Sequence, residues 1–215
     1  MLHIISGLIV CSAAAELTCQ DFFSVWPSDC TSRRVVLEDK LRVISSLMSY
    51  MNASFSIFVA DSYMCNFEYP HVRIREYNMT DVLTESNFTA VLPIIRGWTL
   101  SNNDALTRVS DILRLALQFK YGMSYFDLDV HLLKPERSLY YTSYVGIAVY
   151  SQQKNSLELS NSAFCLPKYI LNDLMDNQIH RIRFGKSTFF YTELGPSKVI
   201  YIIALVAAVC NHFCS

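Results

Sequence analysis

Two carboxylates separated by one residue, Asp127 and Asp129, are the side chains of this chain whose types and spacing most directly predict chemistry. They lie near the end of an otherwise apolar segment that is predicted to be a short strand. Because successive side chains of a strand point to opposite faces, Phe126, Leu128 and Val130 would face a core and both carboxylates the other side. Two such carboxylates repel each other unless a cation lies between them, and Mg²⁺ and Mn²⁺ prefer carboxylate oxygens. The pattern predicts a metal site with open positions for the oxygens of a nucleotide diphosphate.

The segment before these carboxylates is predicted to be an amphipathic helix that ends at Gly122. Leu, Val and Ala side chains form its apolar face. Its other face carries a polar stripe of Asp104, Thr107, Asp111, Arg114 and Gln118. Asp111 and Arg114 are three residues apart and therefore neighbours on the helix surface. A solvated stripe with an internal ion pair is the plain interpretation. The alternative is that these groups reach a crevice at the carboxyl end of the following strand.

The two segments contain the motifs Ser110-Asp111-x-x-Arg114, Lys120-Tyr121-Gly122-x-x-Tyr125-x-Asp127-x-Asp129 and Leu133-Lys134-Pro135. Taken together, these motifs resemble the DXD-containing sugar-binding region of retaining glycosyltransferases, and in pattern the Golgi α-1,4-galactosyltransferases and α-1,4-N-acetylglucosaminyltransferases. The resemblance covers roughly residues 33–200 and is strong over 103–135. Met123 departs from it, because family members usually carry a second glycine there.

The resemblance implies a GT-A-like, Rossmann-type α/β fold, with a mainly parallel sheet flanked by helices. It implies a hexosyltransferase that uses a UDP-sugar, with galactose or N-acetylglucosamine, and Mn²⁺ or Mg²⁺. The acceptor would be a glycan of a glycolipid or glycoprotein, glycosylated with retention of stereochemistry. The family continues well past the pair Gly195-Pro196, whereas this sequence has nineteen more residues, so the domain is expected to be C-terminally truncated and its acceptor half shortened.

The resemblance also implies roles for single residues. Asp129 would bind the metal directly, and Asp127 would contact the metal shell or the ribose and sugar; both are the expected catalytic residues. The donor would be bound by Ser110, Asp111, Arg114, Tyr125 and Asp127. Asn161 would contact the acceptor, although a turn-forming asparagine is an equal explanation.

Length and composition predict one globular domain over residues 16–215. The chain has 215 residues, of which 52% are apolar and 17% charged, so it can bury a sizeable core. Its net charge of −1 and the lack of a basic cluster argue against a nucleic-acid partner.

The first 15 residues predict a signal peptide or a short membrane anchor. Residues 2–15 carry no formal charge and end in small residues before Glu16. A buried N-terminal strand is the alternative. Three glycosylation sequons begin at Asn52, Asn78 and Asn87, and they agree with transit through the secretory pathway. We expect a location in the Golgi lumen or membrane, or secretion, with membrane association through the N-terminus.

Cysteine usage fits an oxidising compartment. Six cysteines follow the leader, an even number that permits disulfides, and Cys19–Cys30 is the preferred local pair. The remaining chain alternates strands and helices, as parallel α/β sheets do. The predicted strands are 33–37, 54–60, 72–77 and 144–150. The predicted helices are 38–50, a helix from Asp81 capped by Asn78 or Thr80, and 169–179.

Two other classes remain open at this point. The haloacid-dehalogenase phosphatases also place Asp-x-Asp-Val after an apolar strand, with the first Asp as nucleophile, but residues 136–215 do not supply the rest of that set convincingly. A non-catalytic fragment that binds a nucleotide-sugar or calcium is the second class. Donor binding without transfer would distinguish it.

Overall fold

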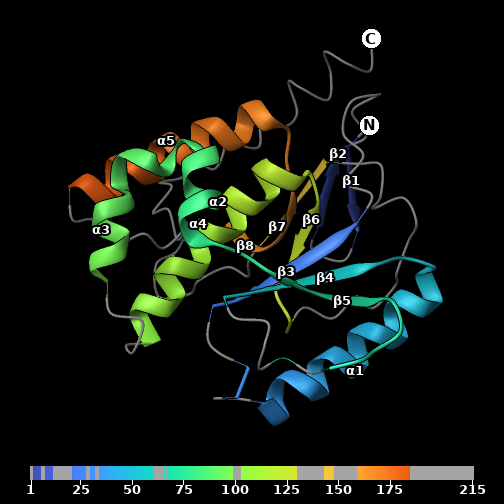
Figure 1. The fold of residues 1–215 in the computed structure, drawn as a ribbon. Helices are drawn as coiled ribbons and strands as arrows, with labels where there is room; N and C mark the ends of the chain where they lie inside the picture. The colour runs from blue at the N-terminus through green and yellow to red at the C-terminus, as the bar shows by residue number, and fades with distance from the viewer. Residues whose placement is uncertain are drawn as a thin grey trace, which may run out of the picture.

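The computed structural model describes residues 2–5, 8–11, 21–27, 30–31, 34–60, 65, 67–98, 103–129, 143–147 and 159–184. These residues form an α/β fold, a five-stranded mainly parallel sheet flanked by five helices (Figure 1). Its strands are β3 (Phe22–Trp26), β4 (Phe55–Val59), β5 (Val72–Glu76), β6 (Ser124–Phe126) and β8 (Leu159–Cys165). The helices are α1 (Arg34–Met51), α2 (Met79–Glu85), α3 (Leu92–Gly97), α4 (Asn103–Tyr121) and α5 (Lys168–Arg183), and a 3-10 turn η1 (Asn87–Val91) precedes α3.

The strand order of the sheet has a topological switch point. Strands β5, β4, β3 and β6 lie side by side in this order and are parallel. The chain therefore winds outward from β3 through β4 to β5, and then returns to the other side of β3 with β6. Open α/β sheets bind ligands outside the carboxyl ends of the strands where the winding reverses. That point lies between β3 and β6, directly before Asp127.

Beyond β6 the strand pairing is antiparallel, and it begins with β8, the fifth strand named above. Strand β8 pairs with β6, and β7 (Ser143–Ile147), β2 (Leu8–Cys11) and β1 (Leu2–Ile5) follow in this order. Two strands thus lie inside the segment expected to be a leader, as in the alternative of an N-terminal strand. The predicted processing of this segment stays a prediction.

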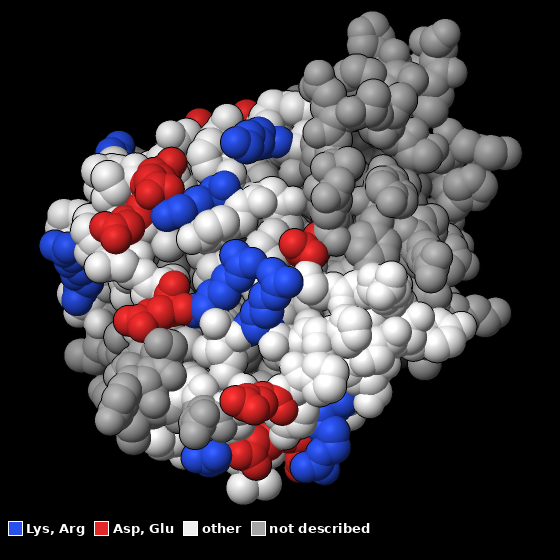
Figure 2. All heavy atoms as spheres, turned by 45° about the vertical axis from the view of Figure 1, so that its right-hand side comes forward, with Lys and Arg blue, Asp and Glu red and all other residues white. Residues whose placement is uncertain are grey.

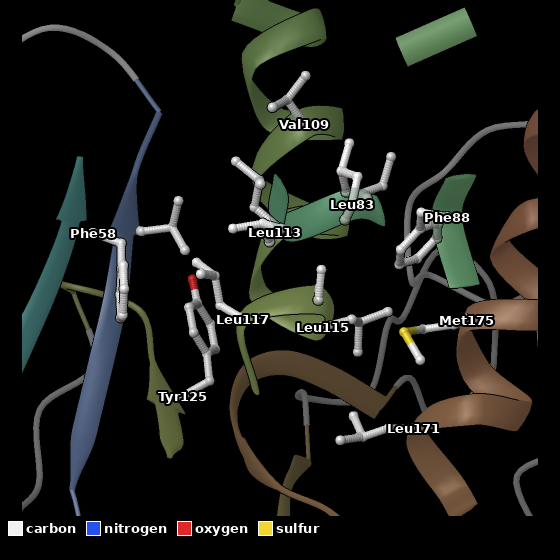
Figure 3. Close-up of a cluster of buried hydrophobic side chains, with 14 of the residues drawn as sticks. Phe58, Leu83, Phe88, Val109, Leu113, Leu115, Leu117, Tyr125, Leu171 and Met175 are labelled. Atoms are coloured by element: carbon white, nitrogen blue, oxygen red, sulfur yellow. The ribbon is translucent and has the colours of Figure 1, made fainter. Parts of the chain in front are cut away.

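The two faces of the sheet carry different helices. Helix α1 covers one face, and α2 to α5 gather on the other (Figure 1). Alternation along β3 matches this arrangement, because Phe22 packs in the core under α1 while Phe23 and Val25 pack in the core around α4. Figure 3 shows this second core, in which Tyr125 lies close to Leu117.

Helix α4 is buried on several sides rather than amphipathic at the surface. It packs on β3 and β6, and α2 and α5 also contact it. Consequently Asp111, Arg114 and Gln118 of the polar stripe are buried, whereas Thr107 is exposed. The interpretation of a solvated stripe is wrong for these three residues.

Most predicted elements are confirmed, one predicted strand is wrong, and one observed strand has no predicted counterpart. Strands 54–60 and 72–77 and the helix 169–179 correspond to β4, β5 and α5, and Asn78 caps α2 by accepting hydrogen bonds from the backbone N–H of Thr80 and Asp81. The predicted strand 33–37 is wrong, because α1 already begins at Arg34. The exposed Val35 and Val36 supply the β-branched residues that favour a strand locally. Strand β3, the centre of the parallel sheet, has no counterpart among the predicted elements.

The disulfide that the structure describes differs from the preferred pair. Cys30 is bonded to Cys65, 35 residues further along the chain, whereas Cys19–Cys30 was expected. Cys30 follows β3 and Cys65 follows β4, so neighbouring parallel strands bring both cysteines to the carboxyl edge of the sheet. Sequence proximity could not reveal this pairing, because it depends on the order of the strands.

Among the helices of the described residues, none combines the length and the apolar character that crossing a membrane requires.

Candidate functional site

The chain leaves the sheet earlier than the sequence predicts. Strand β6 ends at Phe126, Asp127 follows it directly, and Leu128 and Asp129 form a turn. Phe126 and Leu128 are buried in the core under α1, as the predicted alternation requires. The prediction that the strand carries both carboxylates is wrong, since the described strand has only three residues. Val130 lies outside the described residues.

A buried cluster behind Asp127 joins α4 to β6. The Arg114 guanidinium lies 3.1 Å (Nη2) from Asp111 Oδ1 and 3.5 Å (Nη1) from Asp127 Oδ2. Its Cζ lies 4.7 Å from the centre of the Tyr125 ring, a cation–π distance. The Tyr125 hydroxyl donates a hydrogen bond to the other oxygen of Asp127, Oδ1. Both oxygens of this carboxylate are therefore engaged by the protein itself.

Ser110 completes the enclosure of Arg114 from the preceding turn of α4. Its backbone carbonyl accepts from Arg114 Nε at 3.3 Å, and its hydroxyl accepts from Nη2 at 3.3 Å. The five residues expected to bind the donor thus form one connected group. Gln118, one turn further along α4, donates instead to the carbonyl of Leu166 at 3.3 Å and joins α4 to the end of β8.

Burial and charge shift the protonation equilibria of this cluster in opposing directions. Burial raises the pKa of Asp127, while the positive charge of Arg114 and the hydrogen bond from Tyr125 lower it, and the net shift is upward. Burial lowers the pKa of Arg114, but the neighbouring Tyr125, Asp127 and Asp111 outweigh this and raise it. Burial likewise raises the pKa of Tyr125. Arg114 therefore stays charged and Tyr125 stays a hydrogen-bond donor at neutral pH.

Exposure separates the two carboxylates of the Asp-x-Asp pair. The side chain of Asp127 is 29% exposed, and Asp129 is exposed at the turn. In contrast, the side chains of Asp111 and Arg114 are 5% and 7% exposed, and Tyr125 is fully buried. A ligand that approaches the edge of the sheet would therefore meet the two carboxylates first.

The carboxylates of Asp127 and Asp129 could hold a hard divalent cation only if water and a bound substrate supplied its other ligands. Within the described residues no three His, Cys, Asp or Glu side chains lie close enough to hold a metal ion. Mg²⁺ in nucleotide sites is commonly held by one or two carboxylates, with water and substrate phosphate in the other positions. Asp129, which is exposed, and the exposed part of Asp127 meet that requirement.

Two residues near the site have no counterpart among the predicted site residues. The charge of Lys40 on α1 lowers the pKa of Asp127, which places Lys40 within electrostatic range of that carboxylate. Trp26 is the last residue of β3 and lies half-buried at the switch point. Trp26 lies at this edge because β3 ends there, and Lys40 because α1 follows β3. Neither relation could be seen in the sequence before β3 had been recognised.

Asn161 and the three sequon asparagines are the other residues that the sequence analysis singled out. Asn161 falls within β8, and its side chain is outside the described residues, as are Gly195-Pro196 and the loop 151–157. The sequon residues Asn52, Asn78 and Asn87 are all exposed. Acidic and basic side chains are interspersed on the face that Figure 2 shows, and a small group of basic side chains adjoins near its centre.

Comparison with protein-family models, curated proteins and solved structures finds no significant match for this chain.

Proposed function

We propose that the chain is a glycosyltransferase that binds a UDP-sugar, with galactose or N-acetylglucosamine, at the carboxyl edge between β3 and β6. The observation that carries this proposal is the position of Asp127 and Asp129, which leave β6 at the switch point of a parallel sheet with Arg114 buried behind them. The resemblance of residues 103–135 to the DXD region of retaining glycosyltransferases gives the reaction class.

In this proposal the two aspartates divide their tasks according to exposure. Asp129 would bind Mn²⁺ or Mg²⁺ directly, and Asp127 would contribute from its exposed side or contact the ribose and sugar. The ion, when bound, would neutralise the negative charge that develops on the departing UDP. Trp26 ends β3 at the same edge, where an indole ring can stack on a base. Lys40 of α1 lies within electrostatic range of Asp127, and its ammonium group can attract a phosphate.

The same geometry disfavours the phosphatase alternative. A haloacid-dehalogenase-type nucleophile would be the first aspartate, which is Asp127. Its two oxygens accept from Tyr125 and pair with Arg114. A carboxylate held in this way is poorly placed to attack a phosphorus atom, because attack would require both partners to be released.

The compartment is part of the proposal. A buried disulfide between Cys30 and Cys65 and three exposed sequon asparagines support folding in the secretory pathway. We propose the Golgi lumen or membrane as the site of action, with secretion as the alternative, and a glycan of a glycolipid or glycoprotein as acceptor.

The test is to incubate the protein with UDP-galactose or UDP-N-acetylglucosamine and Mn²⁺, with and without a lactose-terminated acceptor. We expect both donors or one of them to bind, and slow release of UDP by hydrolysis to exceed transfer. Asp129→Asn should abolish UDP release, whereas Asp176→Asn, at an exposed position of α5, should not change it. Absence of binding of both donors to the wild-type protein would contradict the proposed function.

A further inference from the structure

Groups of the protein contact all three nitrogens and one face of the Arg114 guanidinium. Asp111 and Ser110 hold Nη2, the Ser110 carbonyl accepts from Nε, and Tyr125 lies under the guanidinium plane. The remaining nitrogen, Nη1, is directed to Asp127. With a side chain only 7% exposed, Arg114 has little surface left for a ligand.

Asp127 is the member of this group through which the cluster reaches solvent. Its side chain is 29% exposed, compared with 5% for Asp111, and Tyr125 has no exposed surface. Its rotamer is fixed from two directions, by the Tyr125 hydroxyl on Oδ1 and by the Arg114 guanidinium near Oδ2. A bidentate or branched guanidinium contact fixes geometry in a way that a single ammonium group does not.

We propose that Arg114 is a positioning residue that acts on the ligand through Asp127 and does not itself touch the donor. The inference rests on the proposed function, and it differs from the role expected from the resemblance, in which Arg114 binds the sugar or a phosphate. Asp111 and Ser110 hold the guanidinium, the guanidinium orients Asp127, and Asp127 presents its exposed side to the nucleotide and its cation.

The experiment is a double-mutant cycle between Arg114→Lys and Asp127→Asn, measured by calorimetry of UDP and of UDP-galactose in Mn²⁺. Lysine keeps the charge but cannot contact Ser110, Asp111 and Asp127 at the same time. We expect Arg114→Lys to weaken both ligands equally, on the order of tenfold, within the range measured for contacting residues. In the Asp127→Asn background, Arg114→Lys should weaken ligand binding by less than about twofold, because the carboxylate that Arg114 positions is gone.

Either of two results of the binding measurements would overturn the proposal. A much larger loss for UDP-galactose than for UDP would show that Arg114 contacts the sugar. Equal losses from Arg114→Lys in the wild-type and Asp127→Asn backgrounds would show that Arg114 does not act through Asp127. If Arg114→Lys fails to fold, Ser110→Ala, which removes one hydrogen bond to the guanidinium, should give a smaller loss with the same pattern.

A ligand-free readout separates this proposal from the proposed function. The same cycle, measured as free energy of unfolding in urea, should also be non-additive, since the ion pair is present without ligand. Additivity in urea would overturn the positioning role whatever the protein binds. If the cycle is non-additive in urea but the wild-type protein binds neither UDP nor UDP-galactose, the proposed function is overturned. The coupling between Arg114 and Asp127 then stays in place.

Discussion

Asp127 and Arg114 show that a charged side chain needs protein partners to the extent that it is buried. A charge that leaves water is tolerated only when partners replace its hydration, and removing one partner is more costly than the pair is stabilising. Arg114 has such partners in Asp111, Ser110 and Tyr125, and it stabilises the half-buried Asp127 in turn. Asp129 needs no such support because it is exposed. Within the proposed function, ligand contact therefore falls to Asp127 and Asp129.

Removing the Tyr125 hydroxyl should be costly although the ring remains. In Tyr125→Phe, Asp127 loses a charge-assisted hydrogen bond in a largely buried environment, and we expect the free energy of unfolding to fall by roughly 1.5–3 kcal/mol. Urea denaturation measures this. Tyr50→Phe is the matched control, since Tyr50 is 76% exposed and should change stability by less than about 0.5 kcal/mol. Equal effects of the two substitutions would contradict the described hydrogen bond.

The membership of this cluster could be predicted from the sequence, but its burial could not. Spacing alone makes Asp111 and Arg114 neighbours on a helix, and the order of helix and strand directs them toward Asp127. Whether that face is solvated depends on α2 and α5, which contact α4 from distant parts of the chain. No local pattern carries this information.

Among the elements, β3 and the segments that follow it organise the sheet edge that carries Asp127 and Asp129. β3 lies between β4 and β6, so the loops after β3 and β4 and the turn after β6 meet at one edge. The disulfide Cys30–Cys65 ties two of these loops together. β3 was not predicted, because five residues without clear alternation give a weak signal beside longer periodic segments. The helix α4 was predicted, since its period extends over five turns and ends at Gly122, whose φ of +66° favours glycine.

We expect the disulfide to contribute about 2–4 kcal/mol to the free energy of unfolding, a range typical of bridges that close loops of this length. The comparison is between Cys30→Ser, Cys65→Ser and the double variant in urea. Because each single change breaks the same bond, all three variants should lose similar stability, and peptide mapping of the wild-type protein should recover the Cys30–Cys65 pair. A double variant that loses the sum of the two single losses would contradict this pairing.

The whole molecule is a doubly wound sheet with its antiparallel extension on one side, and its class was predictable from alternating strands and helices. The strand order was not, because it depends on which faces are covered rather than on local sequence. Exposure of all three sequon asparagines agrees with a protein that passes through the secretory pathway.

In a eukaryotic secretory host the protein should lose mass when N-glycans are removed enzymatically. Asn78→Asp is an informative variant, because aspartate keeps the N-cap of α2 but cannot carry the glycan. In the secretory host, Asn78→Asp should run at lower mass than the wild-type protein. When both proteins are expressed without glycans, their thermal stability should be the same. Asn78→Ala should lose the same glycan and about 1 kcal/mol of stability. A wild-type protein without any mass change would contradict the secretory assignment.

The central claim is that Asp127 and Asp129 bind a nucleotide diphosphate through a divalent cation at the switch point between β3 and β6. Calorimetry of UDP binding with and without Mn²⁺ tests it most directly. We expect Mn²⁺ to strengthen UDP binding by at least about tenfold, or 1.4 kcal/mol, and Asp129→Asn to remove this dependence. Equal UDP affinity in the presence and absence of Mn²⁺ would contradict it.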